Sequence, residues 1–339
     1  MPPTPMTRRH AIQMLALGGL ALSLGIDELR AVTMGGTHLT RVHDTRLLMG
    51  TLATLTVVTD RPNAARAAID TSFTRMDQLE QMLSRFKPGS QVSLLNRTGA
   101  LSGATPDLCR LVSKSIAYGE QTAGAFDVTV EPLLNAYRAA ARQGRLPDTS
   151  DVIRLKALAD YRNIQKQDDQ ISLQPGMGIT LDGLAKGYIL DAGADVLVHA
   201  GFADVLVEAG GDMMARGMTG RGGWKIGIQS PRSAMPAELL ETVRVENAAL
   251  TTSGDYQHQF LNTDHHHILD PQTGDSPTAL CSVTVLAPNA CDADALSTAL
   301  MVLGPTAGLA FIAQWPCAEA LMIDKQDSLW RSSGFSTLT

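Results

Sequence analysis

The chain has 339 residues and is 44% hydrophobic, so it can bury the core of one large domain or two ordinary ones. Its formal net charge of −6 and pI near 5.7 argue against a general nucleic-acid-binding protein, which would normally carry a basic patch. Aromatic residues make up only 4%, so a planar ligand would be held mainly by aliphatic and main-chain contacts.

The first 26 residues have the pattern of an export signal. Arg8 and Arg9 precede the run AIQMLALGGLALSLGI, which is too short to span a bilayer well. The arginine pair resembles a twin-arginine signal, although the usual aromatic residue after it is missing. We expect residues 1–31 to be a leader and the mature protein to be periplasmic. An uncleaved inner-membrane anchor is the alternative, because no clean A-x-A cleavage site is present.

Strands and helices alternate in the first half of the mature chain. The alternation of apolar and small polar residues over 47–58 predicts one strand, and a helix is predicted over 62–83. A loop is expected over 84–96, and a second helix over 106–122. Residues 142–151 are polar and contain a glycine and a proline, which indicates an exposed connector between two subdomains.

The second half continues the alternation. A helix is predicted from the 179–191 segment to about His199, and a strand within 203–217 ends in a glycine pair. A helix over 292–303 leads to Gly304-Pro305, a normal stop signal. Further strands are predicted at 224–229, in the 250–262 region and at 281–288. We expect a mixed α/β (α+β) architecture.

The four cysteines contain no C-x-x-C pair, which argues against structural zinc and thioredoxin-like sites. Buried free thiols are the expectation, and a Cys281–Cys291 disulfide is the alternative in an oxidising compartment. The cysteines are Cys109, Cys281, Cys291 and Cys317.

An aspartate and a threonine, Asp294 and Thr298, lie four residues apart at the start of the predicted 292–303 helix. Both side chains would lie on one face and point back toward the helix N-terminus. Two hard oxygen ligands beside unsatisfied backbone N–H groups suit Mg²⁺ bound together with a phosphate, which indicates a nucleotide-handling enzyme. In isolation, such a pair is more often an acidic residue in the first turn of a helix and a threonine that only fills a helix position. Other segments must therefore decide whether the pair binds Mg²⁺.

Other motifs are weaker. His265, His266 and His267 are consecutive and suggest zinc, but three adjacent residues cannot easily direct their side chains at one metal. Ser84 and Lys87 match the S-x-x-K string of penicillin-recognising enzymes, but no K-T-G follows. The signatures of P-loop, zincin and ordinary dinucleotide-binding folds are missing from the sequence.

Several segments occur in an order that resembles the ApbE family, the FAD:protein FMN transferases. The segments are LLMGT, SRFKPGSQVSLLN, GAFDVTVEPLLNAY, LDGLAKGYILD, VEAGGD, SGDY, HILDPQTG and DADALSTAL. The resemblance spans 41–303 and implies an ApbE-like domain over 41–334, with two α/β subdomains and the flavin nucleotide site between them. It also implies that FAD is split with Mg²⁺, that AMP leaves, and that FMN is attached through a phosphoester to a Ser or Thr of a partner protein.

The resemblance also implies which residues form the site. It implies that the Asp294 and Thr298 side chains and the main-chain carbonyl of Gly183 bind Mg²⁺. His267 would help to deprotonate the acceptor hydroxyl. Contacts to the flavin nucleotide are implied for Met49, Phe86, Ala125, Phe126, Asp127, Thr180, Lys186, His267 and Ile268.

One stretch departs from the family pattern. Family members usually carry Asp at the position of Thr180 and Gly at the position of Asp182, so the carboxylate is displaced by two residues. On a strand, residues two apart face the same side, and Asp182 could then partly replace the missing catalytic group; in a turn this argument fails. The T-L-D-G-x-A pattern resembles the NosX-type branch, periplasmic accessory proteins of nitrous oxide respiration.

The implied partner is a membrane-anchored or periplasmic electron-transfer protein with an exposed Thr, such as a NosR-like or an Rnf/Nqr-like subunit, and no nucleic acid is implied. Two other functions fit the same residues. One is a periplasmic flavin-binding or delivery protein in which the change at Thr180 and Asp182 has abolished turnover. The other is an FAD pyrophosphatase that releases FMN and AMP.

Overall fold

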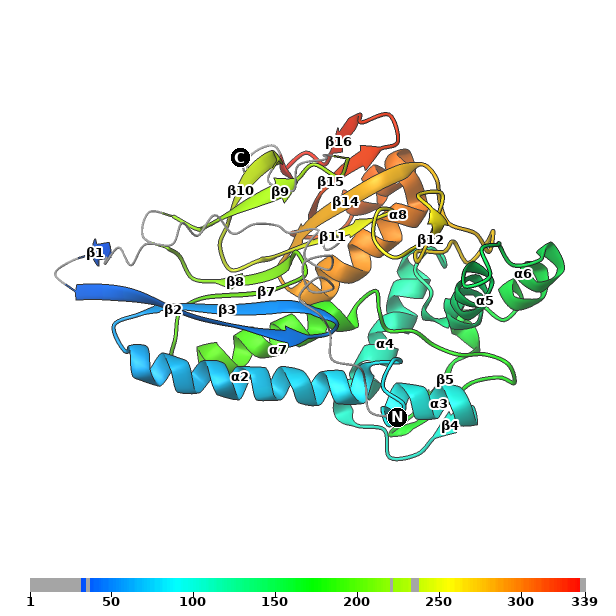
Figure 1. Cartoon of the computed structure of the whole chain (residues 1–339), viewed down its shortest axis with the longest axis horizontal. Coiled ribbons are helices and arrows are strands. Elements are labelled where there is room, and N and C mark those ends of the chain that lie inside the picture. The colour runs from blue at the N-terminus through cyan, green and yellow to red at the C-terminus, as the bar shows by residue number, and fades with distance from the viewer. Residues whose placement is uncertain (1–31, 35–36, 220–221, 233–237, 336–339) are drawn as a thin grey trace.

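A nine-stranded sheet forms the centre of the fold, in the order β1-β2-β3-β7-β8-β11-β14-β15-β16 (Figure 1). The computed structural model of the chain describes residues 32–34, 37–219, 222–232 and 238–335, so the predicted leader, residues 1–31, lies outside the described residues. Neighbouring strands in this sheet are antiparallel. The strands are β1 (Val32–Met34), β2 (Thr37–Leu48), β3 (Thr51–Thr59), β7 (Asp204–Ala209), β8 (Asp212–Arg216), β11 (Ala249–Gly254), β14 (Leu280–Ala287), β15 (Glu319–Asp324) and β16 (Leu329–Arg331).

Shorter elements surround this sheet. The small sheets are formed by β9 (Trp224–Gln229) with β10 (Leu239–Val245), by β12 (Gln259–Asn262) with β13 (His265–His266), and by β4 (Ala100–Leu101), β6 (Gln170–Ser172) and β5 (Gln165–Gln167). The helices are α2 (Pro62–Leu83), α3 (Gln91–Thr98), α4 (Pro106–Gln121), α5 (Glu131–Ala141), α6 (Thr149–Lys156), α7 (Ala185–His199) and α8 (Ala290–Ile312), with 3-10 turns η1 (Val128–Val130) and η2 (Tyr161–Asn163).

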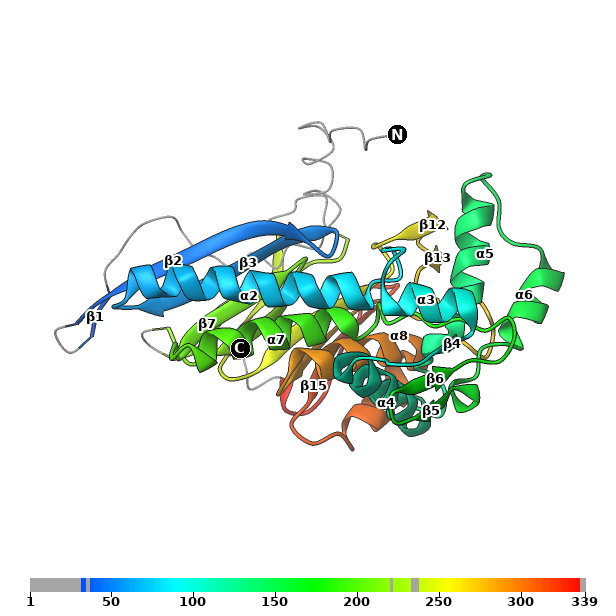
Figure 2. The same cartoon turned by 90° about the horizontal axis from the view of Figure 1, so that it is seen from below.

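Helices α2, α7 and α8 lie side by side on one face of the sheet, and the β9–β10 hairpin packs on the other face (Figures 1 and 2). The main core lies between the helices and the sheet. Its fully buried side chains include Leu55 and Val57 of β3, Met76 of α2, Leu190 of α7 and Leu300 of α8. This burial of apolar surface is the main force that holds the helical layer in place. The expected mixed α/β class is confirmed.

Three helices, α2, α4 and α7, lie where the sequence pattern predicts them. Helix α2 begins at Pro62 and ends at Leu83, as predicted, with proline in the first turn, where its missing N–H costs nothing. Helix α4 begins at Pro106 behind the N-cap Thr105, whose hydroxyl accepts from a backbone N–H. Helix α7 ends at His199 as predicted.

The predicted single strand over 47–58 is wrong, because the chain turns back within it. Strand β2 ends at Leu48 and β3 begins at Thr51, so Met49 and Gly50 form a two-residue turn. Both have positive φ, 53° and 72°, as in the type I′ turns that match the twist of a hairpin. Met49 therefore lies at the tip of a hairpin.

Three further segments differ from expectation. The loop predicted over 84–96 already contains the start of α3, where Ser90 caps the helix by accepting from Ser93 N. The strand predicted within 203–217 is two strands, β7 and β8, joined through the glycine pair. Residues 142–151 connect α5 to α6, which begins within this stretch at Thr149. Its role as a subdomain connector stays a prediction.

The predicted stop at Gly304-Pro305 is confirmed, because a kink at Gly304 ends the first helical segment of α8. Helix α8 runs from Ala290 to Ile312, and Gly304 interrupts it with φ 74° and ψ 179°. Pro305 fits the first turn of the helical segment that follows, because its N–H is not needed there. Among the described residues, α8 is the one helix with the length and composition of a membrane span, but half of that stretch is buried in the protein.

The four cysteines are free, and no described pair forms a disulfide. Cys281 and Cys291, the pair considered for a bridge, are both buried. Cys109 is partly buried, whereas Cys317 is exposed.

Helices α7 and α8 touch through their backbones at Gly187. A Cβ at this position would lie 2.1 Å from the carbonyl oxygen of Ala290. Beside this contact, Asp191 of α7 accepts from the N–H groups of Ala290 and Cys291 at 2.8 and 2.9 Å, which satisfies donors at the start of α8. The two helices are therefore fixed to each other at the N-terminal end of α8.

Replacing Gly187 with alanine should destabilise the protein strongly, because backbone atoms cannot yield to the new Cβ. We expect the free energy of unfolding to fall by about 1–3 kcal/mol or more, measured by urea unfolding. Gly193→Ala in the same helix is the matched control, since its Cβ would meet the flexible Met76 side chain at 2.7 Å. Equal losses in the two variants would contradict this interpretation.

Candidate functional site

A cleft opens between the N-terminal part of α8, the loop before α7, the segment before η1, and the ends of β8 and β11. Most residues implied by the family resemblance line it. They are Ala125, Phe126, Asp127, Thr180, Asp182, Gly183, Lys186, His267, Ile268, Asp294 and Thr298. Chain segments far apart in the sequence thus supply one surface.

Two implied residues do not line this cleft. Met49 lies at the β2–β3 turn, where its N–H donates to Glu80 Oε2 at 3.0 Å. Phe86 is 68% exposed, and the guanidinium groups of Arg85 and Arg138 lie 4.2 and 5.5 Å from the centroid of its ring. Because Arg138 lines the cleft, Phe86 stands near its rim. A flavin contact by either residue stays a prediction.

Asp294, Thr298 and Gly183 come close together. Asp294 is 5% exposed, and its Oδ2 accepts from Gly187 N at 3.1 Å. Thr298 follows one turn later in α8, and a Cβ at Gly183 would lie 3.2 Å from its Oγ1. The structure therefore brings a carboxylate, a hydroxyl and a glycine backbone together beside the same cleft.

A buried carboxylate cluster surrounds Lys186. Its Nζ lies 2.6 Å from Asp212 Oδ2, and Asp212 Oδ1 accepts from Thr252 N at 2.9 Å. Desolvation alone would lower the pKa of Lys186, but Asp212 and Asp294 outweigh it and raise this pKa. One lysine thus faces several carboxylates.

The donor set fits a hard divalent cation. Desolvation, and then repulsion from Asp212, raise the pKa of Asp294 to about 7, so this carboxylate lacks enough positive charge around it. Oxygen donors from one carboxylate, one hydroxyl and one carbonyl suit Mg²⁺, which keeps waters or substrate phosphates as its other ligands. The part of the chain that the structure describes holds no group of three or more His, Cys, Asp or Glu placed to bind a metal.

Glu208 belongs to the same acidic region. Its Oε1 accepts from Gly211 N at 3.1 Å, across the β7–β8 turn. Burial, and then Asp212, raise the pKa of Glu208 from 4.5 to about 7. The folded protein therefore binds a proton here that the unfolded chain releases between these two pH values.

Replacing Glu208 with glutamine should stabilise the metal-free protein at high pH only. A raised folded-state pKa means that stability is fully present below about pH 4.5 and is lost as pH rises toward 7. We expect the melting temperatures of variant and wild type, measured in EDTA, to agree at pH 4.5 and to differ by a few degrees at pH 8. Glu120→Gln, on the exposed surface of α4, is the control. A gain at every pH would contradict the assignment.

His267 faces the cleft in a defined tautomer. Its Nδ1 lies 3.1 Å from the Gln257 carbonyl oxygen, which can only accept, so the ring proton is on Nδ1 and Nε2 is an acceptor. Burial, and then His258, lower the pKa of His267 to about 3, which keeps the ring neutral. Its neighbours bond elsewhere: His265 to Asp275 and His266 to the Pro277 carbonyl.

The departure at Thr180 and Asp182 lies in irregular chain and a turn, so the argument from strand alternation fails. Thr180 is buried, and its Oγ1 accepts from Asp182 N at 3.2 Å. Asp182 lines the cleft but pairs with Arg85 Nε at 2.7 Å, and Arg85 also bonds Glu131. The displaced carboxylate is therefore held by an arginine.

Asp127 shapes the loop that it belongs to. Its Oδ1 accepts from Thr129 N at 2.8 Å, and its Oδ2 accepts from Tyr161 N at 2.9 Å. Both oxygens are thus used within the protein, and the loop 125–127 is fixed at the cleft wall. A contact between Asp127 and a base or ribose stays a prediction.

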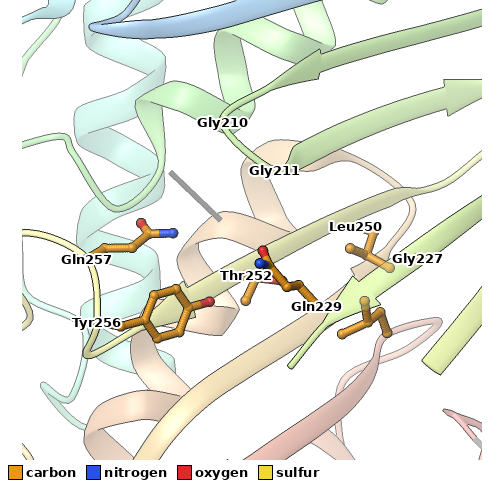
Figure 3. Close-up of a pocket in the computed structure, with 9 residues that line it drawn as sticks. Gly210, Gly211, Gly227, Gln229, Leu250, Thr252, Tyr256 and Gln257 are labelled. Carbon is orange, nitrogen blue, oxygen red and sulfur yellow. The ribbon is translucent and has the colours of Figure 1, made fainter. Parts of the chain in front are cut away.

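Sequence reasoning missed several cleft residues. Asp212 stands in VEAGGD, which the family resemblance includes, but nothing in the string gives this aspartate a role. No sequence feature indicated that Arg138 or Gln257 lines the cleft. Gln257 also lines a smaller adjoining pocket, together with Thr252 and the glycine pair (Figure 3).

Comparisons with known proteins agree with the resemblance found in the sequence motifs. The family model described as ApbE family matches residues 49–322. The chain is 31% identical over 280 residues to the FAD:protein FMN transferase of Escherichia coli (strain K12), covering 78% of this chain and 79% of that protein. It is 29% identical over 315 residues to that of Treponema pallidum, covering 85% and 86%.

Solved structures agree. The flavin transferase ApbE from Vibrio cholerae superposes with a TM-score of 0.77 at 27% identity, covering 89% of this chain and 100% of that one. The ApbE protein from Thermotoga maritima gives a TM-score of 0.81 at 27% identity, covering 88% and 99%.

Proposed function

This chain belongs to the ApbE family of FAD:protein FMN transferases, and from that premise we propose that it splits FAD in a Mg²⁺-dependent reaction and transfers FMN to a protein hydroxyl. The observation that carries the proposal is the single cleft in which Asp294, Thr298, Gly183 and His267 meet. The cleft offers hard oxygen ligands and a neutral imidazole at one place.

The proposed reaction exchanges the phosphoanhydride bond of FAD for a phosphoester bond to the acceptor. The acceptor oxygen attacks the FMN-side phosphorus of the pyrophosphate, an O–P bond forms, the bond to the AMP phosphate breaks, and AMP leaves. Mg²⁺, when bound, would neutralise charge on the pyrophosphate. Asp294, Thr298 and the Gly183 carbonyl would hold it.

The protein's own residues position and orient the reacting groups. His267 Nε2 accepts the proton of the acceptor hydroxyl, because Nδ1 already donates to Gln257. Lys186, kept protonated by Asp212, adds a positive charge at the cleft wall. Asp182 lines the cleft and is neutralised by its pair with Arg85, so it is not proposed to replace the missing acidic group.

The acceptor is proposed to be an extracytoplasmic electron-transfer protein with an exposed Thr or Ser, of the NosR-like or Rnf/Nqr-like kind. The twin-arginine-like leader supports a periplasmic location, and the T-L-D-G pattern supports the NosX-type branch. Export and the acceptor can be tested separately from the chemistry.

The test is the intact mass of such an acceptor domain after incubation with the mature protein, FAD and Mg²⁺, with AMP followed in the same tube. A gain of one FMN that is lost when the acceptor Thr is replaced supports the transferase. AMP release with an unmodified acceptor, for several acceptors, points to an FAD pyrophosphatase. Bound FAD with neither product points to a flavin carrier.

A further inference from the structure

One short segment, residues 254–258, holds His267 from two sides. The Gln257 carbonyl accepts from His267 Nδ1 at 3.1 Å. The ring of the next residue, His258, meets the His267 ring edge-on, with centroids 5.3 Å apart and planes at 82°. A hydrogen bond and a ring contact from adjacent residues thus fix both the tautomer and the rotation of His267.

The segment is itself anchored at its start. Asp255 is fully buried and pairs with Arg232 Nη2 at 2.7 Å and Lys325 Nζ at 2.5 Å. Its N–H donates to the Cys281 carbonyl at 3.0 Å, which ties the segment to the beginning of β14. Gln257, two residues later, therefore extends from a fixed point.

His258 adopts an uncommon backbone conformation. Its φ of 44° lies in the left-handed region, which costs energy for a residue with a Cβ. This conformation accompanies the ring contact with His267. Local strain of this kind is kept where the surrounding structure requires it.

We propose that segment 254–258 positions His267 for proton transfer, with His258 as a positioning residue. The Gln257 carbonyl keeps the ring proton on Nδ1, and the His258 ring prevents the imidazole from rotating, so that Nε2 stays available in the cleft. The inference rests on the proposed function, in which His267 accepts the proton of the acceptor hydroxyl.

The test removes the ring of His258 but keeps the left-handed backbone conformation at this position. Asparagine tolerates the left-handed conformation, so His258→Asn should leave the segment folded. We expect kcat for FMN transfer to fall about ten- to hundredfold, with an unchanged KM for FAD. His258→Phe restores a ring and should recover most of this loss. His43→Ala, on the exposed side of β2, controls for the loss of a histidine.

A second readout needs no turnover. In ¹⁵N NMR spectra of the resting protein, His267 should show one tautomer in the wild type and averaged signals in His258→Asn. Wild-type kcat in His258→Asn, equal losses in the Asn and Phe variants, or an unaltered His267 signal would overturn the inference. A wild type with an ordered His267 that transfers no FMN would instead contradict the proposed function.

Discussion

Asp294→Ala should abolish FMN transfer, lowering kcat by at least about 10²–10³-fold. The carboxylate is buried in α8, it lines the same cleft as Thr298 and Gly183, and burial and then Asp212 raise its pKa to about 7. Of the proposed Mg²⁺ ligands, only the Thr298 hydroxyl and the Gly183 carbonyl would remain. The measurement is the rate of acceptor flavinylation against Mg²⁺ concentration.

The same variant separates catalysis from stability. Without metal, Asp294→Ala should melt no lower than the wild type at pH 8, because a poorly compensated buried charge is gone. Mg²⁺ with FAD should raise the melting temperature of the wild type but not of the variant. Asp292→Asn is the control on the same helix, since Asp292 bonds Lys114 at 2.6 Å. It should lose stability and keep transfer, and full transfer by Asp294→Ala would disprove the cation assignment.

His267→Asn should lower the transfer rate by about 10²–10⁴-fold while FAD still binds. Asparagine cannot accept the proton of the acceptor hydroxyl. Because the pKa of His267 is lowered to about 3, the ring stays neutral between pH 5 and 8, and its own protonation should not reduce the rate in that range. The measurements are single-turnover flavinylation and FAD binding by fluorescence.

His265, two residues before His267, provides the comparison for that variant. His265 bonds Asp275 at 3.2 Å and does not line the cleft, so His265→Asn should transfer FMN at nearly the wild-type rate. If His267→Asn transferred FMN at the wild-type rate, His267 would not be the proposed base. A loss of FAD binding in that variant would assign His267 to substrate binding.

Periodicity and capping residues predicted helices α2, α4, α7 and the first part of α8, whereas α3, α5 and α6 were not predicted. Helix α2 was predicted from Pro62 to Leu83 because proline marks its first turn and its apolar residues recur at helical spacing. The Asp294–Thr298 pair was predictable for the same reason, since its spacing depends only on a local helix. These features need no knowledge of distant contacts.

The hairpin and the ion pairs of the site depend on contacts that a linear pattern does not contain. The Met49-Gly50 turn lacks the Asn-Gly signal of a tight hairpin, so one strand over 47–58 was predicted across it and most of β2 was missed. Asp182 is held by Arg85, which lies 97 residues earlier. No sequence pattern gave Asp212 a role, and only its proximity to Lys186 shows its part in the cleft.

The contact between α7 and α8 has a consequence for how the site forms during folding. The bond from Gly187 to Asp294 joins residues 107 positions apart, and that from Ala290 to Asp191 joins residues 99 apart. Contacts of such high sequence separation form slowly, because a long loop must close first. A nascent chain whose α8 has not yet emerged from the ribosome can already bury α2 against β3, yet it lacks Asp294 and Thr298 in the cleft. Truncated translation products of this protein should therefore be inert toward FAD rather than weakly active.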